Sequence, residues 1–342
     1  MGMTVLREGP GVPELIPPQR PRSLASRPSA ADSVFRRVSY AAGFATVGIL
    51  LAVGLFLALR GGQALRVAKW HFLTQAQWQP EGGVFGIRAV LFGTVTIAVI
   101  AMVVGFPLAF GTALLLSEIV GSRVGRLLVA LVDLMAAVPS IVFGLWGFYF
   151  LQKQIIPVSQ WLASTVGRFI PVFAVTDQDG NPIGDPNFYT STAFIAGLVV
   201  GLMVVPTMTS VMREGFSRAP DGEREGAYAL GATRWGMIQA VVLPFGKGGI
   251  IGGTMLGLGR ALGETIAVAM IISPLFAINW QVLKSGTNSV SALIALRFSE
   301  ASQFGLSALM AAGLALFVVT LVVNFTASSI VARSRSGAES DG

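Results

Sequence analysis

The chain has 342 residues, of which 53% are hydrophobic and only 12% are charged. A soluble globular domain carries about 25% charged residues, so this composition argues against a soluble protein. The chain has no cysteine and a single histidine, His71, which excludes disulfide frameworks, thiolate metal sites, cysteine nucleophiles and histidine metal clusters. The net charge of +7 lies in the tails and short loops, so membrane topology explains it better than a nucleic-acid partner.

Six apolar runs are long enough to cross a lipid bilayer as helices. They predict an all-α polytopic membrane protein with spans at residues 40–59, 89–116, 127–151, 190–212, 248–272 and 306–328. The first run is too long and too far along the chain to be a signal peptide, so we expect it to be retained. Residues 1–39, rich in Pro, Ser and Arg, are predicted to form a disordered tail.

The basic residues predict the orientation of these spans. With the N-terminus inside, the inner segments carry more Lys and Arg than the outer loops do. Both termini are therefore predicted to be cytoplasmic, in the plasma or inner membrane. The sequence then divides into a cytoplasmic tail (1–39), a first helix with an interfacial segment (40–84), a core with five further helices (85–330) and a second cytoplasmic tail (331–342). Residues 213–247 form the longest cytoplasmic loop.

This cytoplasmic loop carries the strongest functional signal. It reads Glu225-Gly226-Ala227-Tyr228-Ala229-Leu230-Gly231, followed nine residues later by Val241-Val242-Leu243-Pro244. The spacing resembles the motif E-A-A-x3-G-x9-I-x-L-P of ABC importer permeases, with Gly226 and Val241 as the two departures. The residues themselves favour a short helix that begins after Pro220 and ends at Gly231.

The resemblance implies that this short helix couples the permease to a soluble ATPase. The residues expected to take part are Glu225, Gly226, Ala227, Gly231, Leu243 and Pro244. The sequence contains no G-x-x-x-x-G-K-[ST] phosphate-binding loop. We therefore expect the chain to be non-catalytic and to bind no cofactor or metal, with ATP and Mg²⁺ held by the partner ATPase.

Further segments are similar to phosphate importer permeases of the PstC type. They are Leu258–Met270, Ala137–Gly147 and the run from Phe85-Gly86 through Gly93-Thr94 and Pro107 to Leu116-Ser117-Glu118. This resemblance implies a type I ABC importer permease fold. It also implies a complex with one PstA-like permease subunit, two cytoplasmic ATPase subunits and an extracytoplasmic phosphate-binding protein, embedded in membrane lipid.

The fifth span contains two charges, Arg260 and Glu264. Each charge at mid-membrane costs about 2.5–3.5 kcal/mol, so the presence of both residues in an apolar span requires an explanation. Four residues apart on one predicted helix, they are expected to share a face and to pair. We assign both to the substrate pathway, because a guanidinium offers phosphate a planar fork of donors and Glu264 would accept a hydrogen bond from a protonated phosphate oxygen. The alternative is an ion pair that only fixes helix packing.

Several alternatives stay open from the sequence alone. Asp133 suits a capping or interface role better than transport, and Pro107, Pro139 and Pro206 are expected to kink their spans. The segment that begins at Asp177 starts like a calcium loop, but Pro182 replaces the required glycine, so no calcium site is expected. Two alternative functions remain: an ABC permease for another oxyanion or small solute, and an ATP-independent secondary transporter. A secondary transporter would not need the coupling motif.

Overall fold

The computed structural model describes residues 30–177 and 179–335, most of them in helices. Helices in the first half are α1 (Ala30–Ala68), α2 (His71–Thr74), α3 (Arg88–Leu114), α4 (Ser122–Ala136), α5 (Ser140–Trp146) and α6 (Gln152–Thr165). Those in the second half are α7 (Ala193–Ser217), α8 (Asp221–Ala229), α9 (Arg234–Met237), α10 (Leu243–Gly263), α11 (Ile266–Ile271), α12 (Val290–Arg297) and α13 (Gln303–Arg335). A short hairpin pairs β1 (Trp78–Gln79) with β2 (Val84–Phe85).

The chain divides into two compact units at residue 52, inside α1. Of the first unit the structure describes residues 30–52, a helix whose side chains are almost all exposed. This helix begins at Ala30, so the prediction of a disordered tail up to residue 39 is wrong for its last ten residues. The rest of that tail, residues 1–29, lies outside the described residues. At the other end α13 runs on to Arg335, past the predicted start of the second tail at residue 331.

Within the described residues, six helical segments are long and apolar enough to cross a membrane, as predicted. They are Ala31–Ala68, Arg88–Ile119, Ser140–Arg168, Ala193–Ser217, Arg234–Gly263 and Gln303–Thr326. The third differs from the predicted span 127–151, because the chain leaves the helical conformation at Pro139 (φ −59°, ψ 141°). Proline lacks an N–H and disfavours a helical residue before it, so α4 and α5 are separate helices rather than one kinked helix.

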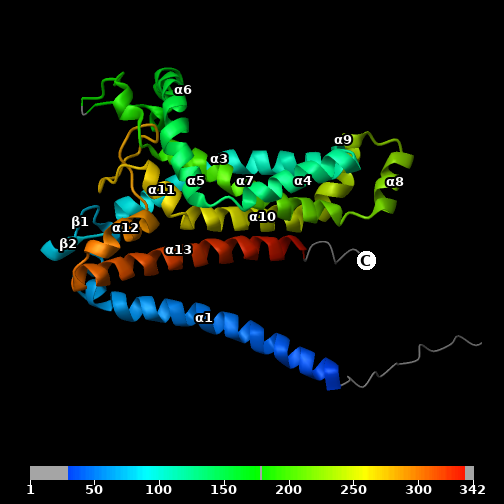
Figure 1. The fold of residues 1–342 in the computed structure, drawn as a ribbon, viewed down its shortest axis with the longest axis horizontal. Helices are drawn as coiled ribbons and strands as arrows, with labels where there is room; N and C mark the ends of the chain where they lie inside the picture. The colour runs from blue at the N-terminus through cyan, green and yellow to red at the C-terminus, as the bar shows by residue number, and fades with distance from the viewer. Residues whose placement is uncertain (1–29, 178, 336–342) are drawn as a thin grey trace, which may run out of the picture. The chain divides into compact units, whose positions relative to one another are not determined.

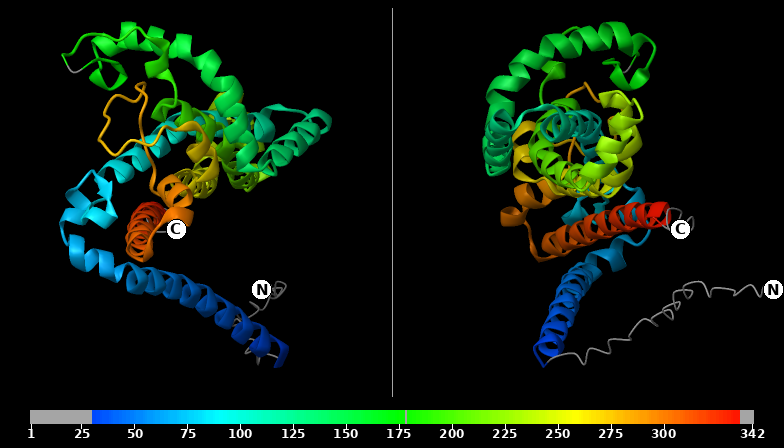
Figure 2. Two further views of the ribbon diagram at one scale, coloured as in Figure 1. Left: turned by 60° about the vertical axis from the view of Figure 1, so that its left-hand side comes forward. Right: turned by 90° about the vertical axis from the view of Figure 1, so that its right-hand side faces the viewer.

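In the second unit α3, α4, α7, α10 and α13 run side by side, while α6 turns away from their common direction (Figures 1 and 2). Helices α8 and α9 lie at one end of this bundle, and α12 and the hairpin lie at the other (Figure 1). A continuous apolar core joins α3, α7, α10 and α11. A second cluster joins the end of α1, Phe72, Phe85 and α13.

Close approach of backbones holds α3 against α7. A Cβ atom on Gly201 would lie 2.9 Å from the Ala101 carbonyl oxygen, and one on Gly105 would lie 3.0 Å from the Gly201 oxygen. The Thr209 hydroxyl donates to the Ala109 carbonyl at 3.3 Å, a further contact between the same two helices. Small residues at such a seam let membrane helices gain van der Waals contact, which is the main force that associates them.

We expect Gly201→Leu to lower the melting temperature of the purified protein in detergent. Overpacking of a tight contact costs about 1–3 kcal/mol of unfolding free energy. Gly111→Leu on α3 is the matched control, because nothing lies within 4 Å of a Cβ at that position. Equal melting temperatures for the two variants would contradict the close α3–α7 seam.

Candidate functional site

Arg260 and Glu264 are not paired in the structure, contrary to the prediction. Helix α10 ends at Gly263, and Glu264 has an extended backbone with ψ of 129°. The two residues therefore do not lie one turn apart on a single helix. Among the described residues, no carboxylate lies within 4.0 Å of the Arg260 guanidinium. The predicted span 248–272 is instead the helix α10 followed by the separate short helix α11.

Arg260 reaches across to α7 rather than to Glu264. Its Nη1 donates to the Thr207 hydroxyl at 3.3 Å, which leaves most of the guanidinium donors unused. The side chain is half-buried and lines a groove of about 510 Å³ together with Gly252, Met255, Leu256, Gly259, Asn324 and Ser328. A guanidinium beside the small polar side chains of α13 is a suitable place for an anion, because it offers several hydrogen-bond donors.

Glu264 caps the break between α10 and α11. Its carboxylate Oε1 accepts from the Ala267 amide at 3.2 Å, and its carbonyl oxygen accepts from the Ser291 hydroxyl at 2.6 Å. Within the described residues, its Oε2 atom has no hydrogen-bond partner. The carboxylate therefore keeps a free acceptor while it holds the first turn of α11.

A buried polar cluster lies next to this break, and the sequence reasoning missed it. The Thr94 hydroxyl accepts from the Val290 amide at 2.9 Å, and Ser289 caps α12 by accepting from the Ala292 amide at 3.2 Å. Asn288 is 1% exposed, and its side-chain Nδ2 has no hydrogen-bond partner. The cluster joins α3 to the start of α12, and Ser291 of α12 bonds the Glu264 carbonyl, so α12 supports the break.

The residues predicted to take part in coupling lie in α8, just after it and at the start of α10, and α8 itself is the predicted short helix. Helix α8 spans Asp221–Ala229. Gly231 follows its end with a left-handed φ of 86°, as expected for the residue that terminates it. Ala227 is half-buried against the core, whereas Glu225 and Gly226 are exposed. Leu243 begins α10 half-buried, and Pro244 takes its first turn, where the missing N–H costs nothing.

The end of the bundle that carries α8 and α9 exposes three large apolar side chains among charged ones. Leu230 is 91% exposed, Trp235 56% and Tyr228 46%, and these three side chains flank the turn between α8 and α9. Contiguous exposed apolar side chains of this size mark an interaction surface. The spacing motif located this surface, although only the structure shows which of its side chains are uncovered.

A buried ion pair ties α8 to α3, and it too was missed from the sequence. Arg224 of α8 donates from Nη1 to Glu118 Oε2 at 3.0 Å, and the Glu118 side chain is 2% exposed. Arg224 Nη2 also donates to the Phe216 carbonyl at 3.0 Å, and Ser117 Oγ donates to Glu118 Oε1 at 2.6 Å. Glu118 lies in a π-helical turn, Leu115–Ile119, that follows α3. This pair fixes α8 to the end of a membrane helix.

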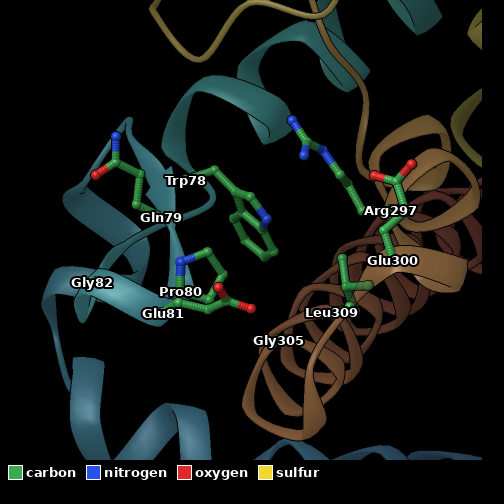
Figure 3. A pocket seen from close by; sticks show the side chains of 10 residues that line it. Trp78, Gln79, Pro80, Glu81, Gly82, Arg297, Glu300, Gly305 and Leu309 are labelled. Carbon is green, nitrogen blue, oxygen red and sulfur yellow. The ribbon is translucent and has the colours of Figure 1, made fainter.

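The opposite end of the bundle carries a pocket of about 320 Å³ between the hairpin and α13. Trp78, Glu81, Arg297 and Glu300 surround it (Figure 3). Trp78 packs edge-to-face on Phe85, and Phe72 is buried. Trp78 and Phe72 therefore pack against the bundle. Trp70 is 79% exposed, which suits an interfacial position. The pocket's charged side chains are exposed and of both signs, so we assign it no ligand.

Asp133 and the turn at Asp177 are not part of the candidate site around Arg260 and Glu264. Asp133 is exposed on α4. The Asp177 carboxylate accepts from the Asn181 and Asp179 amides at 2.8 Å and 2.9 Å, and these bonds, the Asn181 amide foremost, lower the pKa of Asp177. Within the described residues, no group of three or more acidic or histidine side chains is arranged to hold a metal ion.

Comparisons with known proteins agree with this architecture. Residues 105–336 match the family described as binding-protein-dependent transport system inner membrane component. The chain is 41% identical over 281 residues to the phosphate transport system permease protein PstC of Mycobacterium leprae, covering 81% of this chain and 85% of that protein. It is 36% identical over 312 residues to PstC 2 of Mycobacterium tuberculosis, covering 90% and 93%. A bacterial alginate ABC transporter, crystallised with an alginate-bound periplasmic protein, shares the fold at a TM-score of 0.57 with 16% identity, covering 89% of this chain and 96% of its own.

We expect Glu118→Gln to destabilise the protein markedly, because it leaves the Arg224 charge without its partner. Loss of one member of a buried pair costs about 3–5 kcal/mol of unfolding free energy. The matched control is Glu214→Gln, which breaks the exposed pair between Glu214 and Arg218 at 3.9 Å. That surface pair contributes under about 1 kcal/mol. Melting temperatures in detergent separate the two cases, and equal effects would show that the 118–224 pair is not a structural tie.

Proposed function

Because the chain belongs to the family of binding-protein-dependent transport system inner membrane components, we propose that it is a permease subunit of an ATP-driven importer of inorganic phosphate. The observation that carries this proposal is the similarity to PstC proteins over more than four fifths of the chain. The placement of Arg260 in an apolar helix, half-buried and with unused donors, supports an anionic cargo. The protein is then a multi-pass membrane subunit without catalytic activity of its own.

In this proposal Arg260 and Glu264 act on phosphate from two sides of the helix break. Arg260 binds a phosphate oxygen through its guanidinium, with Thr207 fixing one nitrogen. Glu264 offers the free Oε2 to a protonated phosphate oxygen, which sulfate lacks at neutral pH. Their separation supports recognition better than a closed ion pair would, because an Arg–Glu pair would first have to be opened by the cargo.

The partners follow from the coupling surface and the family. A complete transporter would contain a PstA-like permease subunit, two ATPase subunits that bind ATP and Mg²⁺, and an extracytoplasmic phosphate-binding protein. Each ATPase would receive an exposed helix such as α8, with the exposed apolar side chains of Tyr228 and Leu230 entering a groove. The pair Glu118–Arg224 would pass the movement of α8 to α3. Both termini would then be cytoplasmic, as the basic residues predict.

The cargo assignment is tested by uptake of radiolabelled phosphate into vesicles that contain the assembled complex. Arg260→Gln should abolish uptake, and Arg260→Lys should lower it at least about tenfold, since the charge stays but the planar fork is lost. Glu264→Gln should slow uptake or weaken discrimination against sulfate. Arg218→Gln is the matched control, because Arg218 is exposed near the end of α7 and should leave uptake unchanged.

Two outcomes would overturn the assignment. Near-normal phosphate uptake by Arg260→Gln, normalised to assembled complex, would remove Arg260 from the pathway. Preferred uptake of sulfate by the unaltered complex would assign the transporter to another oxyanion. Loss of assembly in every Arg260 variant would instead support the purely structural role of this charge.

The coupling surface and the orientation are tested together with single cysteines, since the native chain has none. A cysteine at Leu230 should react with a membrane-impermeant maleimide only when the cytoplasmic side is open, and the ATPase should protect it. A cysteine at Phe169, which is 86% exposed in the loop after α6, should react from outside whether or not the ATPase is present. External labelling at position 230 would invert the topology, and unprotected labelling there would reject α8 as the docking helix.

A further inference from the structure

Asn288 is a buried residue whose side-chain donor is unused. It is 1% exposed, and within the described residues its Nδ2 atom has no hydrogen-bond partner. Its Oδ1 atom accepts from the Ser289 amide at 2.9 Å, so the acceptor half of the side chain is satisfied and the donor half is not. A buried donor without a partner destabilises a fold, and at membrane depth no bulk water replaces the missing acceptor. The Asn288 donor therefore needs an acceptor that the chain itself does not supply.

A second asparagine in the same loop shows how the chain satisfies such a side chain. Asn279 donates from Nδ2 to the carbonyl oxygens of residues 284–286 at 3.2, 3.4 and 3.0 Å. Its Oδ1 atom accepts from the Gln281 amide at 3.1 Å. Asn279 thus holds the loop together with both halves of its side chain, a structural role that the Nδ2 atom of Asn288 does not share.

A short series of contacts connects Asn288 to the helix break at Glu264. Ser289, whose amide bonds to Asn288, has its hydroxyl 3.5 Å from the hydroxyl of Ser291. The Ser291 hydroxyl in turn donates to the Glu264 carbonyl at 2.6 Å. The unused donor of Asn288 and the free Oε2 atom of Glu264 therefore belong to one polar cluster.

The segment that contains Asn288 is pressed against the backbone of α3. A Cβ atom on Gly93 would collide with the Asn288 carbonyl oxygen and would lie 2.8 Å from the Thr287 hydroxyl. The Thr94 hydroxyl accepts from the Val290 amide at 2.9 Å on the same helix face. Helix α12, which begins here, lies at the opposite end of the bundle from α8 and α9 (Figure 1). In the proposed orientation this is the outer end, from which an imported anion enters.

We propose that Asn288 is a further cargo-binding residue, whose Nδ2 donates to a phosphate oxygen on the outer side of Glu264. This inference rests on the proposed function and adds a residue to the same pathway. In the structure the segment is closed on α3 and the donor is unused, so separation of the segment from Gly93 would present the donor to the entering anion. A neutral amide suits this step, because it bonds to an oxyanion without a charge that would hold the anion in place.

The test uses the complete transporter in vesicles and measures uptake of radiolabelled phosphate and ATP hydrolysis together. Asn288→Leu should lower uptake at least about tenfold, because it removes a hydrogen bond to a charged ligand. ATP hydrolysis stimulated by the binding protein should stay at the unaltered level, since the ATPases would turn over without capturing cargo. A defect in folding would lower both rates. Asn288→Ser keeps a donor and should retain more uptake than Asn288→Leu.

Asn279→Leu is the matched control, because it removes the same type of side chain from the same loop. It breaks bonds that the structure contains, whereas the donor lost in Asn288→Leu has no partner. Asn279→Leu should therefore lower the melting temperature in detergent more than Asn288→Leu does. The amount of phosphate moved per ATP hydrolysed should remain that of the unaltered complex in Asn279→Leu and should fall in Asn288→Leu.

Three results would overturn the inference. Unchanged uptake by Asn288→Leu, in a complex whose unaltered form imports phosphate, would reject Asn288 and leave the proposed function intact. A joint fall of uptake and ATP hydrolysis, with a melting temperature as low as that of Asn279→Leu, would show a structural role such as the binding of a buried water. Failure of the unaltered complex to import phosphate would overturn the proposed function, and the role of Asn288 as a phosphate ligand with it.

Discussion

Inside a bilayer a backbone amide or carbonyl that loses its helical partner costs several kcal/mol unless another group replaces that partner. This constraint decides where the membrane helices of this protein can break. At Pro139 the break removes no amide donor, because proline has none. At Glu264 the replacement is built from side chains: the carboxylate takes the Ala267 amide, and Ser291 supplies a hydroxyl to the free carbonyl. Irregular backbone at membrane depth is tolerated only where such groups enclose it or where it lines a cavity.

The break at Glu264 also decides what its two neighbouring charges do. On an unbroken helix, Arg260 and Glu264 would face each other and neutralise one another. With the break, Arg260 bonds to α7 and Glu264 bonds to α11. Each charge is thus held by a different helix and keeps unused hydrogen-bonding capacity. A cargo that carries both acceptor oxygens and a proton donor matches this arrangement better than one that carries acceptors alone.

The sequence predicted the features that depend on local pattern, and it missed those that depend on tertiary contact. Six apolar spans and the helix end at Gly231 follow from hydropathy and from glycine chemistry, and both are confirmed. No proline near Gly263 predicts the break that follows it, so the sequence pattern indicates a continuous helix. One of the groups that stabilise the break, the Ser291 hydroxyl, comes from 27 residues away. The pair Glu118–Arg224 joins residues 106 apart, and no local pattern distinguishes Glu118 from an exposed loop carboxylate.

The end of the bundle that carries α8 and α9 shows why such distant contacts matter. Helix α8 has nine residues, too few to be stable alone in water. Its conformation is maintained by Ala227 packed on the core and by Arg224 bonded to Glu118 and to the Phe216 carbonyl. These contacts leave the face with Tyr228 and Leu230 uncovered, so the helix is anchored on one side and exposed on the other. The link between α8 and α3 therefore includes a buried ion pair, and separating it would be costly because it would strand two charges.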